Sequence, residues 1–310
     1  MADGDLLWGQ WQGLSAAQRE FAAAQLSRYF LSPLLAVDAR EPVRVTTFGQ
    51  TFETYDFLIA GEWLRFVPGM GRVPLGVATP LPRPMHAVAQ QMGLAPDAVG
   101  AALSPATTVD MPPMLVARTS IPSTLEMIGQ VDLTTQQFRG NHFAYQPVRQ
   151  AVLRLLTPTV ASLDPAAAEL APVMATETLE LRQVGATTYQ VALRHPDWDR
   201  QALQKRLGGF GFALASEREY EYLMGGGQAE LFPWGNRLPD APMNFVPNRF
   251  GLTVPLRRPG SELIDAPVGK SLSLAGPPTG ADWLSLSPFF RTAAPAFATT
   301  RYRKIVRIAL

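Results

Sequence analysis

The segment Leu214-Ala-Ser-Glu-Arg-Glu-Tyr-Glu-Tyr-Leu223 is followed closely by the glycine run Gly225-Gly-Gly227. Ser216 and Glu219 stand three residues apart, as in a capping box, where two side chains satisfy the free backbone N–H groups at the start of a helix. Glycine often ends helices because it adopts the left-handed backbone conformation at low cost. The segment therefore predicts a helix that begins after Ser216 and ends at the glycine run.

Two short motifs follow this helix, Phe232-Pro-Trp-Gly-Asn236 and Asn248-Arg-Phe-Gly-Leu252. Both lie in a stretch, 232–288, that has almost no hydrophobic periodicity. A loop of this length in a compact domain is usually functional or anchored. We expect side-chain hydrogen bonds to order it, with Trp234 packing the loop and the Asn236 amide binding backbone groups. A bound ion is a further way to order such a loop.

In order and spacing these segments resemble the formylglycine-generating enzyme (sulfatase-modifying factor) family. Members typically read Leu-Pro-Thr-Glu-Ala-Glu-Trp-Glu-Tyr-Ala-Ala, a glycine pair, Pro-Trp-Gly-Asn and Asn-x-Phe-Gly-Leu. Weaker similarity at 65–76, 115–129 and 195–199 extends the resemblance over residues 45–310. The resemblance implies an α+β fold, irregular and loop-rich, related to C-type lectins and built from small twisted antiparallel sheets. It also implies a helix within 115–129, and a division into an N-terminal helical extension, 1–44, and a formylglycine-generating-enzyme-like domain, 45–310.

The chain has no cysteine. Enzymes of this family oxidise a substrate cysteine with a pair of cysteines that bind copper, so the resemblance implies a member that lacks both this reaction and copper. The absence of cysteine also excludes disulfides, thiolate metal sites and iron–sulfur clusters. Whether another kind of catalysis takes place is open. His86, His142 and His195 are scattered, which favours isolated histidines over a three-histidine metal site.

The second half of the chain holds the candidate ligand residues. After Phe-Gly-Leu the family reads Asp-Met-x-Gly-Asn-Val-Trp-Glu-Trp, whereas this chain has an unlike sequence over 253–265. The nearest alignment leaves Asn248, Glu262 and Asp265 as oxygen ligands for a candidate calcium ion, the metal that family members often bind here. The candidate ligand-binding side chains are Trp234, Asn236, Glu262, Asp265, Arg291 and Tyr302.

Ser15 and Gln18 form another capping-box pattern and predict a helix that ends before Pro33. Its apolar face is a candidate docking face for a partner protein or for a second copy of the chain, and consists of Ala22, Leu26, Tyr29 and Phe30. Further helices are predicted at Arg200–Leu207 and Asp164–Leu170, after the capping-box pattern Ser123–Glu126, and as two short packing helices in 86–100. Strands are predicted at Val43–Phe48, Tyr55–Ile59, Leu64–Val67, Thr188–Leu193 and Lys304–Leu310.

The net charge is close to zero, because 27 basic and 26 acidic residues leave +1. A nucleic-acid-binding protein normally carries a basic excess, so nucleic acid is not expected as a partner. The longest uncharged runs have 13 residues, short of the roughly 20 that span a bilayer. The N-terminus carries Asp3 and Asp5 where a signal peptide would carry basic residues. We expect a soluble, cytoplasmic protein with no membrane partner.

Three functional hypotheses follow. The first is a pseudoenzyme, a non-catalytic protein that binds a small-molecule ligand or a protein on a formylglycine-generating-enzyme-like scaffold, since rigid frames with variable loops suit recognition. The alternative is a cysteine-free oxidoreductase acting on a peptide or a secondary metabolite through carboxylate, arginine and aromatic groups in 234–303. The third is a structural or assembly subunit that docks through the N-terminal helix.

Overall fold

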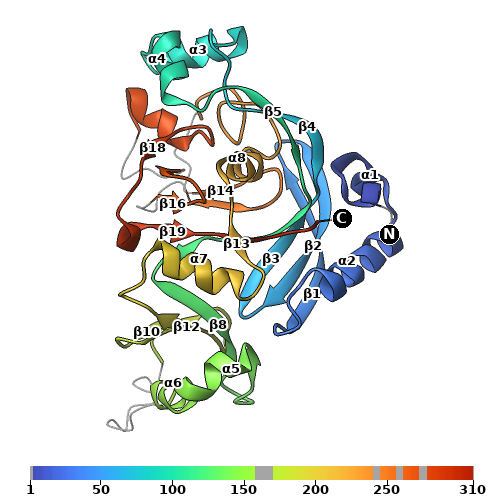
Figure 1. The fold of residues 1–310 in the computed structure, drawn as a ribbon, viewed down its shortest axis with the longest axis vertical. Coiled ribbons are helices and arrows are strands. Elements are labelled where there is room, and N and C mark those ends of the chain that lie inside the picture. The colour runs from blue at the N-terminus through green and yellow to red at the C-terminus, as the bar shows by residue number, and fades with distance from the viewer. Residues whose placement is uncertain (1–2, 158–169, 240–244, 256–260, 272–277, 310) are drawn as a thin grey trace.

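The computed structural model describes residues 3–157, 170–239, 245–255, 261–271 and 278–309. Within these ranges helices and small antiparallel sheets are mixed along the chain, which confirms the α+β class (Figure 1). The helix predicted at Asp164–Leu170 lies outside the described residues except for Leu170. No helix in the described ranges combines the length and apolar character needed to cross a membrane.

The largest sheet has six antiparallel strands, and it confirms four of the predicted strands. The first two strands are joined by the turn Phe48-Gly49, whose two residues have φ values of 52° and 75°, as in the mirror-image turns that suit two-residue hairpins. The C-terminal strand is an inner strand, because it pairs on both sides. In sheet order the strands are β1 (Val37–Thr47), β2 (Gln50–Ile59), β3 (Glu62–Val67), β6 (Met114–Ala117), β20 (Lys304–Arg307) and β13 (Ala213–Leu214).

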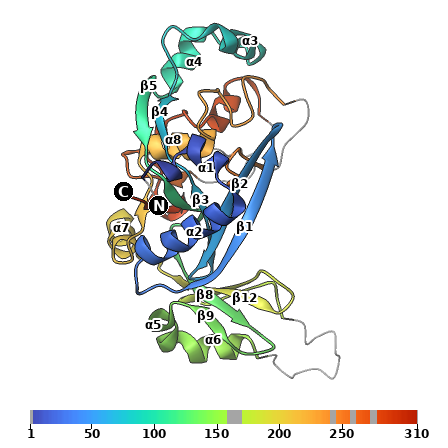
Figure 2. The ribbon, with the colours of Figure 1, turned by 90° about the vertical axis from the view of Figure 1, so that its right-hand side faces the viewer.

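The N-terminal helices α1 (Trp8–Gly13) and α2 (Ala16–Tyr29) lie beside β1 and β2 (Figure 2). The Ser15 capping box is present as predicted. The docking face expected on α2 is wrong for Ala22 and Leu26, because both side chains are buried in the core of the same chain. Phe30 is half-buried against that core, and Tyr29 is exposed. The helical periodicity correctly identified a face that is buried. Sequence alone does not show whether such a face is buried within the chain or in an interface with another chain.

A second sheet, with its own hydrophobic core, forms the module of residues 125–194 at the lower end of the molecule (Figure 1). Helices α5 (His142–Tyr145) and α6 (Arg149–Leu155) and the 3-10 helix η2 (Gln146–Val148) accompany this sheet. In sheet order its strands are β10 (Val173–Ala175), β11 (Leu179–Gln183), β12 (Thr188–Arg194), β8 (Leu125–Asp132) and β9 (Phe138–Gly140).

The helix predicted within 115–129 and after Ser123 is wrong, since this stretch contributes to β6 and β8. Burial along β8 largely alternates, and the strand pairs with β12 on one side and β9 on the other. Glu126 does not cap a helix, because its carboxylate accepts hydrogen bonds from Arg206 and His195. Tertiary strand pairing thus overrides a local helix-start signal.

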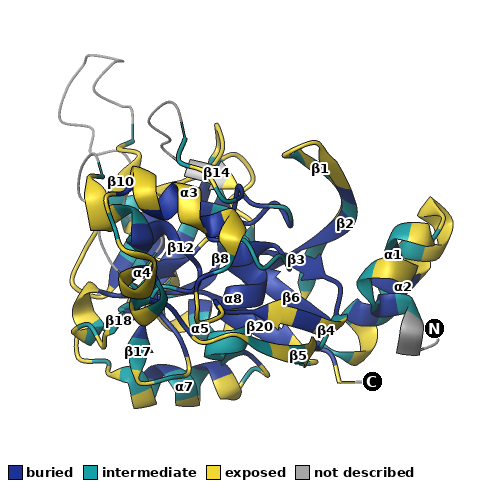
Figure 3. Ribbon diagram, turned by 90° about the horizontal axis from the view of Figure 1, so that it is seen from above, coloured by how far each residue is buried: buried dark blue, intermediate teal, exposed yellow. Residues whose placement is uncertain are grey.

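The described residues outside 125–194 form the main body. Helix α8 (Glu217–Gly225) lies in its middle and is buried along most of its length (Figure 3). The predicted capping box of Ser216 and Glu219 is present, and the helix ends at Gly226, whose φ is 68°. Helix α7 (Arg200–Gly208) also forms as predicted, with Asp199 as its N-cap.

Short elements complete the described fold. The two packing helices expected in 86–100 are present as α3 (Arg83–Gln91) and α4 (Pro96–Ala102). The small ladders are β4 (Met70–Leu75) with β5 (Thr107–Met111), β14 (Phe245–Pro247) with β15 (Thr253–Pro255), β17 (Val268–Gly269) with β18 (Thr292–Ala293), and β16 (Glu262–Leu263) with β19 (Arg301–Tyr302) and β7 (Ile121–Pro122). The remaining 3-10 helices are η1 (Asp3–Leu6), η4 (Gly280–Leu286) and η5 (Phe297–Thr299).

Candidate ligand-binding cleft

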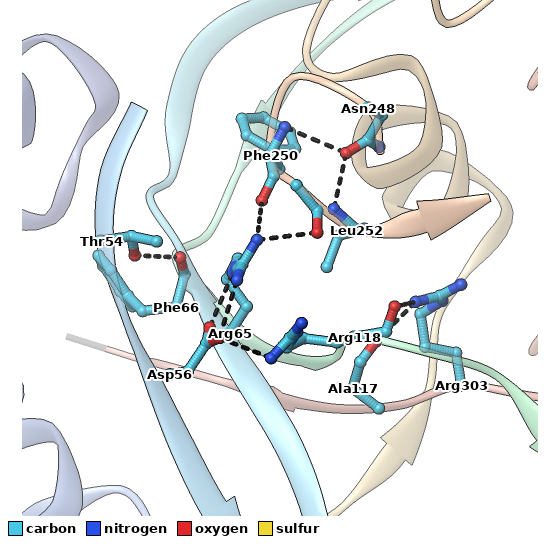
Figure 4. A network of polar contacts seen from close by, with 11 residues as sticks. Thr54, Asp56, Arg65, Phe66, Ala117, Arg118, Asn248, Phe250, Leu252 and Arg303 are labelled. Atoms are coloured by element: carbon cyan, nitrogen blue, oxygen red, sulfur yellow. Dashed lines mark hydrogen bonds and ion pairs between the residues drawn. The ribbon is translucent and has the colours of Figure 1, made fainter. Parts of the chain in front are cut away.

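The Asn248–Leu252 loop is held by one buried amide (Figure 4). The Asn248 Oδ1 atom accepts hydrogen bonds of 3.0 Å from the backbone N–H groups of Phe250 and Leu252. Its Nδ2 group donates to the carbonyls of Leu223 and Met224 at the end of α8. Because a buried backbone group without a partner is costly, this single side chain replaces the strand partners that the loop lacks. It also ties the loop to α8.

Arg65, on β3, supports the same loop from below (Figure 4). Its guanidinium forms a two-pronged ion pair with Asp56, with N–O distances of 2.7 and 2.8 Å, and both side chains are buried. Its Nη1 group donates to the carbonyls of Phe250 and Gly251. A Cβ atom on Gly251 would lie 2.0 Å from Arg65 Nη1, and the φ of Gly251 is 69°. Glycine is therefore required by both space and backbone conformation.

The turn after α8 brings Arg249 close to the glycine run. A Cβ atom on Gly226 would lie 2.7 Å from Arg249 Cβ, so the two backbones approach each other closely. Tyr222, one turn earlier on α8, donates a 2.7 Å hydrogen bond to the carbonyl of Pro68. Since the loop on either side of Arg249 is fixed by Asn248, the position of the arginine is set by the motif around it.

A cleft of about 430 Å³ opens beside this loop. One wall is the hairpin turn between β1 and β2, where the Phe48 side chain is 48 % exposed. Another wall is the Pro-Trp-Gly-Asn motif. The full lining consists of Thr47, Phe48, Gln50, Gln228, Glu230, Pro233, Trp234, Gly235, Asn236, Arg237 and Arg249.

The Pro-Trp-Gly-Asn wall is internally fixed, as the sequence predicts. The Asn236 Oδ1 atom accepts a 2.7 Å hydrogen bond from the Leu231 N–H, and Trp234 Nε1 donates to the carbonyl of Arg237. Trp234 stacks on Phe232, with ring centroids 5.1 Å apart. The structural roles predicted for Trp234 and Asn236 are thus both present, and the two residues also line the cleft.

The charged side chains of the cleft are unevenly buried. Arg249 is half-buried, and its guanidinium lies 4.3 Å from the centre of the Trp8 ring. Burial lowers the pKa of Arg249 from its ordinary value, and the charges of Tyr222 and Glu230 partly oppose this effect. Glu230 is half-buried, and Arg237 is exposed. The lining therefore combines aromatic surface with charge of both signs.

The other predicted ligand-binding residues lie outside this cleft. Glu262 pairs with Arg303 at 2.9 Å, and Asp265 is exposed and accepts a hydrogen bond from Gln204. Arg291 donates to both carboxylate oxygens of Glu217 on α8, at 2.7 and 2.8 Å.

Tyr302 lines a separate small cavity between the main body and the lower module, whose Glu126, Met127 and Asn141 also line it. It is buried and donates a 3.0 Å hydrogen bond to the Leu125 carbonyl, and burial raises its pKa well above the ordinary value. Of the six predicted residues, the structure therefore brings only Trp234 and Asn236 together in the cleft.

The oxygens predicted for calcium do not fit a calcium site. Both hydrogen bonds to Asn248 Oδ1 come from backbone N–H groups, so this oxygen is already satisfied. The Glu262 carboxylate faces the Arg303 guanidinium, which competes with a cation. No three His, Cys, Asp or Glu side chains in the described ranges are grouped as they would be around a metal. His86, His142 and His195 lie in different elements.

A buried ion-pair cluster shows that Glu221, on α8, points inward. Lys270 is fully buried, and its Nζ atom lies 2.9 Å from Glu221 Oε1 and 3.0 Å from Glu217 Oε1. Burial raises the pKa of Glu217, but the hydrogen bonds and charges of Arg291 and Lys270 outweigh this and bring it to about 2. The cluster joins α8 to the loop that carries Lys270.

Sequence reasoning missed the hairpin wall and the charged lining. Phe48-Gly49 carries a turn signal, an aromatic residue followed by glycine between two β-rich runs, which could have marked an exposed aromatic tip. Arg249 lies inside a motif used for recognition, but nothing local separates it from a surface arginine. Glu230 and Gln228 carry no sequence signal at all.

The chain was also compared with known proteins. No protein-family model and no curated protein sequence matches it.

Proposed function

We propose that this chain is a non-catalytic ligand-binding protein on a divergent formylglycine-generating-enzyme-like, C-type-lectin-like scaffold, and that a small molecule binds in the cleft beside Trp234. The motifs that carry the resemblance support this proposal. Phe232–Asn236 forms one wall of the cleft, and Asn248–Leu252 supplies Arg249 and the hydrogen-bonded base beneath it.

The observation that carries the proposal is the cleft itself. Its volume of about 430 Å³ lies within the range of roughly 300–1,000 Å³ that is typical of small-molecule sites. Its walls are fixed by the amides of Asn236 and Asn248 and by the buried Arg65–Asp56 pair. A pocket that is already ordered loses little conformational entropy when a ligand binds.

Binding is favoured over catalysis because groups with strongly shifted pKa values lie outside the cleft. Tyr220 and Tyr302 have pKa values raised well above the ordinary value by burial, and Glu217 has its pKa lowered to about 2. None of these three groups lines the cleft. Catalytic sites usually hold their perturbed groups inside the cleft, where they meet the substrate. The cleft residue with a shifted pKa is Arg249, and an arginine stays protonated and does not serve as a general acid or base.

A blocked cleft tests the proposal. Gln50 is exposed and lines the cleft, so Gln50→Trp should fill it while the chain stays folded. The matched control is Thr51→Trp, at the next position of β2, which is also exposed and points to the other side of the strand. A fragment library is screened by ligand-observed NMR against the wild type and both variants.

We expect fragments that bind the wild type and Thr51→Trp and lose at least tenfold in affinity for Gln50→Trp. Circular dichroism and thermal unfolding check that both variants are folded. The proposal is rejected when every fragment that binds does so equally to all three proteins, or when none binds to the wild type.

A further inference from the structure

The cleft is lined by three charged side chains. Glu230, Arg237 and Arg249 line it, and none of them forms an ion pair or side-chain hydrogen bond with another described residue. Elsewhere in the main body the buried cations Arg65 and Lys270 each face a carboxylate within 3 Å. Arg249, which is half-buried, therefore differs from these two cations.

Arg249 is the most informative of the three. Its Nε atom is buried and has no hydrogen-bond partner among the described residues. The guanidinium stacks on Trp8, at 4.3 Å from the ring centre, so one face of the planar group is covered by an aromatic surface. A stacked guanidinium keeps its N–H donors in the plane of the group, where an acceptor can reach them. Burying a charged donor without an acceptor is costly, and an anion would offset that cost.

We propose that the cleft binds a small organic monoanion, a carboxylate attached to a flat apolar body, with Arg249 as the main anion contact. This inference rests on the function proposed above. Two arginines and one glutamate give the lining a net charge of +1, which matches one negative charge. A guanidinium binds a carboxylate through two parallel hydrogen bonds. Glu230 repels a second negative charge and so disfavours a dianionic phosphate.

The apolar part of the ligand is inferred from the two walls. Phe48 presents a 48 % exposed ring at the tip of the hairpin, where a soluble surface normally favours polar residues. Trp234, which also lines the cleft, is stacked on Phe232 with an interplanar angle of 8°. A lining that contains two aromatic residues beside charged side chains suits a flat apolar group better than a sugar or a chain of hydroxyls.

Four probes of similar shape and different charge test the ligand class at constant ionic strength: benzoate, benzamide, phenyl phosphate and benzylamine. Affinities for the wild type are measured by NMR titration. We expect benzoate to bind at least tenfold more tightly than benzamide and more tightly than phenyl phosphate, and benzylamine to bind most weakly. Equal affinity for benzoate and benzamide overturns the inference, and a preference for phenyl phosphate replaces the monoanion by a phosphate ligand.

Variants locate the anion contact. Arg249→Met keeps an apolar side chain over Trp8 and removes the charge, so it should abolish the preference for benzoate over benzamide without changing the affinity for benzamide. Arg182→Met, in the exposed Arg182–Glu180 pair of the lower module, is the control and should change neither affinity. Glu230→Gln should raise the affinity for phenyl phosphate. A benzoate preference that survives in Arg249→Met rejects Arg249 as the contact.

The two proposals fail in different ways. If benzamide binds the wild type and not Gln50→Trp, but benzoate is not preferred, the cleft is a ligand site and only the anion inference is rejected. If benzoate is preferred and binds Gln50→Trp as tightly as the wild type, the anion site lies elsewhere and both proposals are rejected for this cleft.

Discussion

The main body and the lower module of residues 125–194 bury different kinds of side chain. The module core is built of aliphatic and aromatic residues around a five-stranded sheet. Every charged side chain in the buried set of the described residues lies in the main body, and the members of that set are Asp56, Glu62, Arg65, Glu219, Glu221, Glu262, Lys270, Arg303 and Lys304. The two regions thus satisfy the hydrogen bonds of their buried backbone N–H and carbonyl groups in two different ways.

The difference follows from how much of each region is sheet. Strands in the module satisfy one another's N–H and carbonyl groups by pairing. The loops of the main body have few strand partners, so long side chains take that role. Arg65 donates to the carbonyls of Phe250 and Gly251, and Arg303 donates to the carbonyls of Ala117, Arg118 and Thr253. Each arginine needs a buried carboxylate, and these are Asp56 and Glu262.

The largest expected effect comes from removing one of these arginines. Arg65→Met leaves Asp56 buried with only the half-exposed Arg118 nearby, at 3.2 Å, and leaves two loop carbonyls without their donor. Breaking a buried pair from one side costs about 3–5 kcal/mol. We expect a loss of this size in the free energy of unfolding, measured by urea denaturation.

The control for this prediction is the exposed pair in the module. Arg182→Met removes the partner of Glu180, and an exposed pair contributes about 0–1 kcal/mol. Similar losses in the two variants would contradict the contrast between a main body that depends on buried charge and a module that does not.

A smaller effect is expected from glycine replacements in the main body. Gly251 and Gly93 share the same φ of 69°, but a Cβ on Gly251 would lie 2.0 Å from Arg65 Nη1, whereas nothing lies within 4 Å of one on Gly93. Gly93→Ala should cost about 1–2 kcal/mol for the left-handed backbone alone. Gly251→Ala should cost about 1–3 kcal/mol more, because Arg65 and Val45, whose Cγ2 would lie 2.5 Å from the new Cβ, must both move. Thermal unfolding of both variants measures the difference, and equal losses would show that neither Arg65 nor Val45 is held in place.

Much of the regular structure could be predicted from local sequence signals. The capping boxes at Ser15 and Ser216 both begin helices, because the two side chains that satisfy the free N–H groups are adjacent in sequence. The same pattern at Ser123 failed, since Ser123 Oγ donates to the carbonyl of Phe297, far along the chain. A capping signal is reliable only where no distant partner competes for the side chain.

The site was harder to predict because its parts come from distant segments. Trp234 and Asn236 were found because their motif is local and each satisfies groups within five residues. Glu262 was predicted as a ligand from its alignment with the family motif, and its pairing with Arg303, 41 residues later, has no sequence signal. Arg249 was missed because its lack of an ion partner among the described residues is visible only in the three-dimensional structure.

The smallest expected effect is a pH-dependent loss in the free energy of unfolding, which the main body should show and the module should not. Glu217, in the main body, has a pKa of about 2 in the folded chain and 4.5 in the unfolded chain, so its contribution is present above pH 4.5 and is lost as the pH falls toward 2. Glu217→Gln should therefore cost about 1–2 kcal/mol at pH 7, the size of one charged hydrogen bond after allowing for partial exposure. The difference from the wild type should shrink as the pH falls from 4.5 to 2.

Urea denaturation between pH 2 and pH 7 measures this difference in the free energy of unfolding, with Glu180→Gln in the module as the control. A constant difference at every pH would mean that Glu217 acts through packing, and the ion-pair cluster on α8 would lose its assigned role.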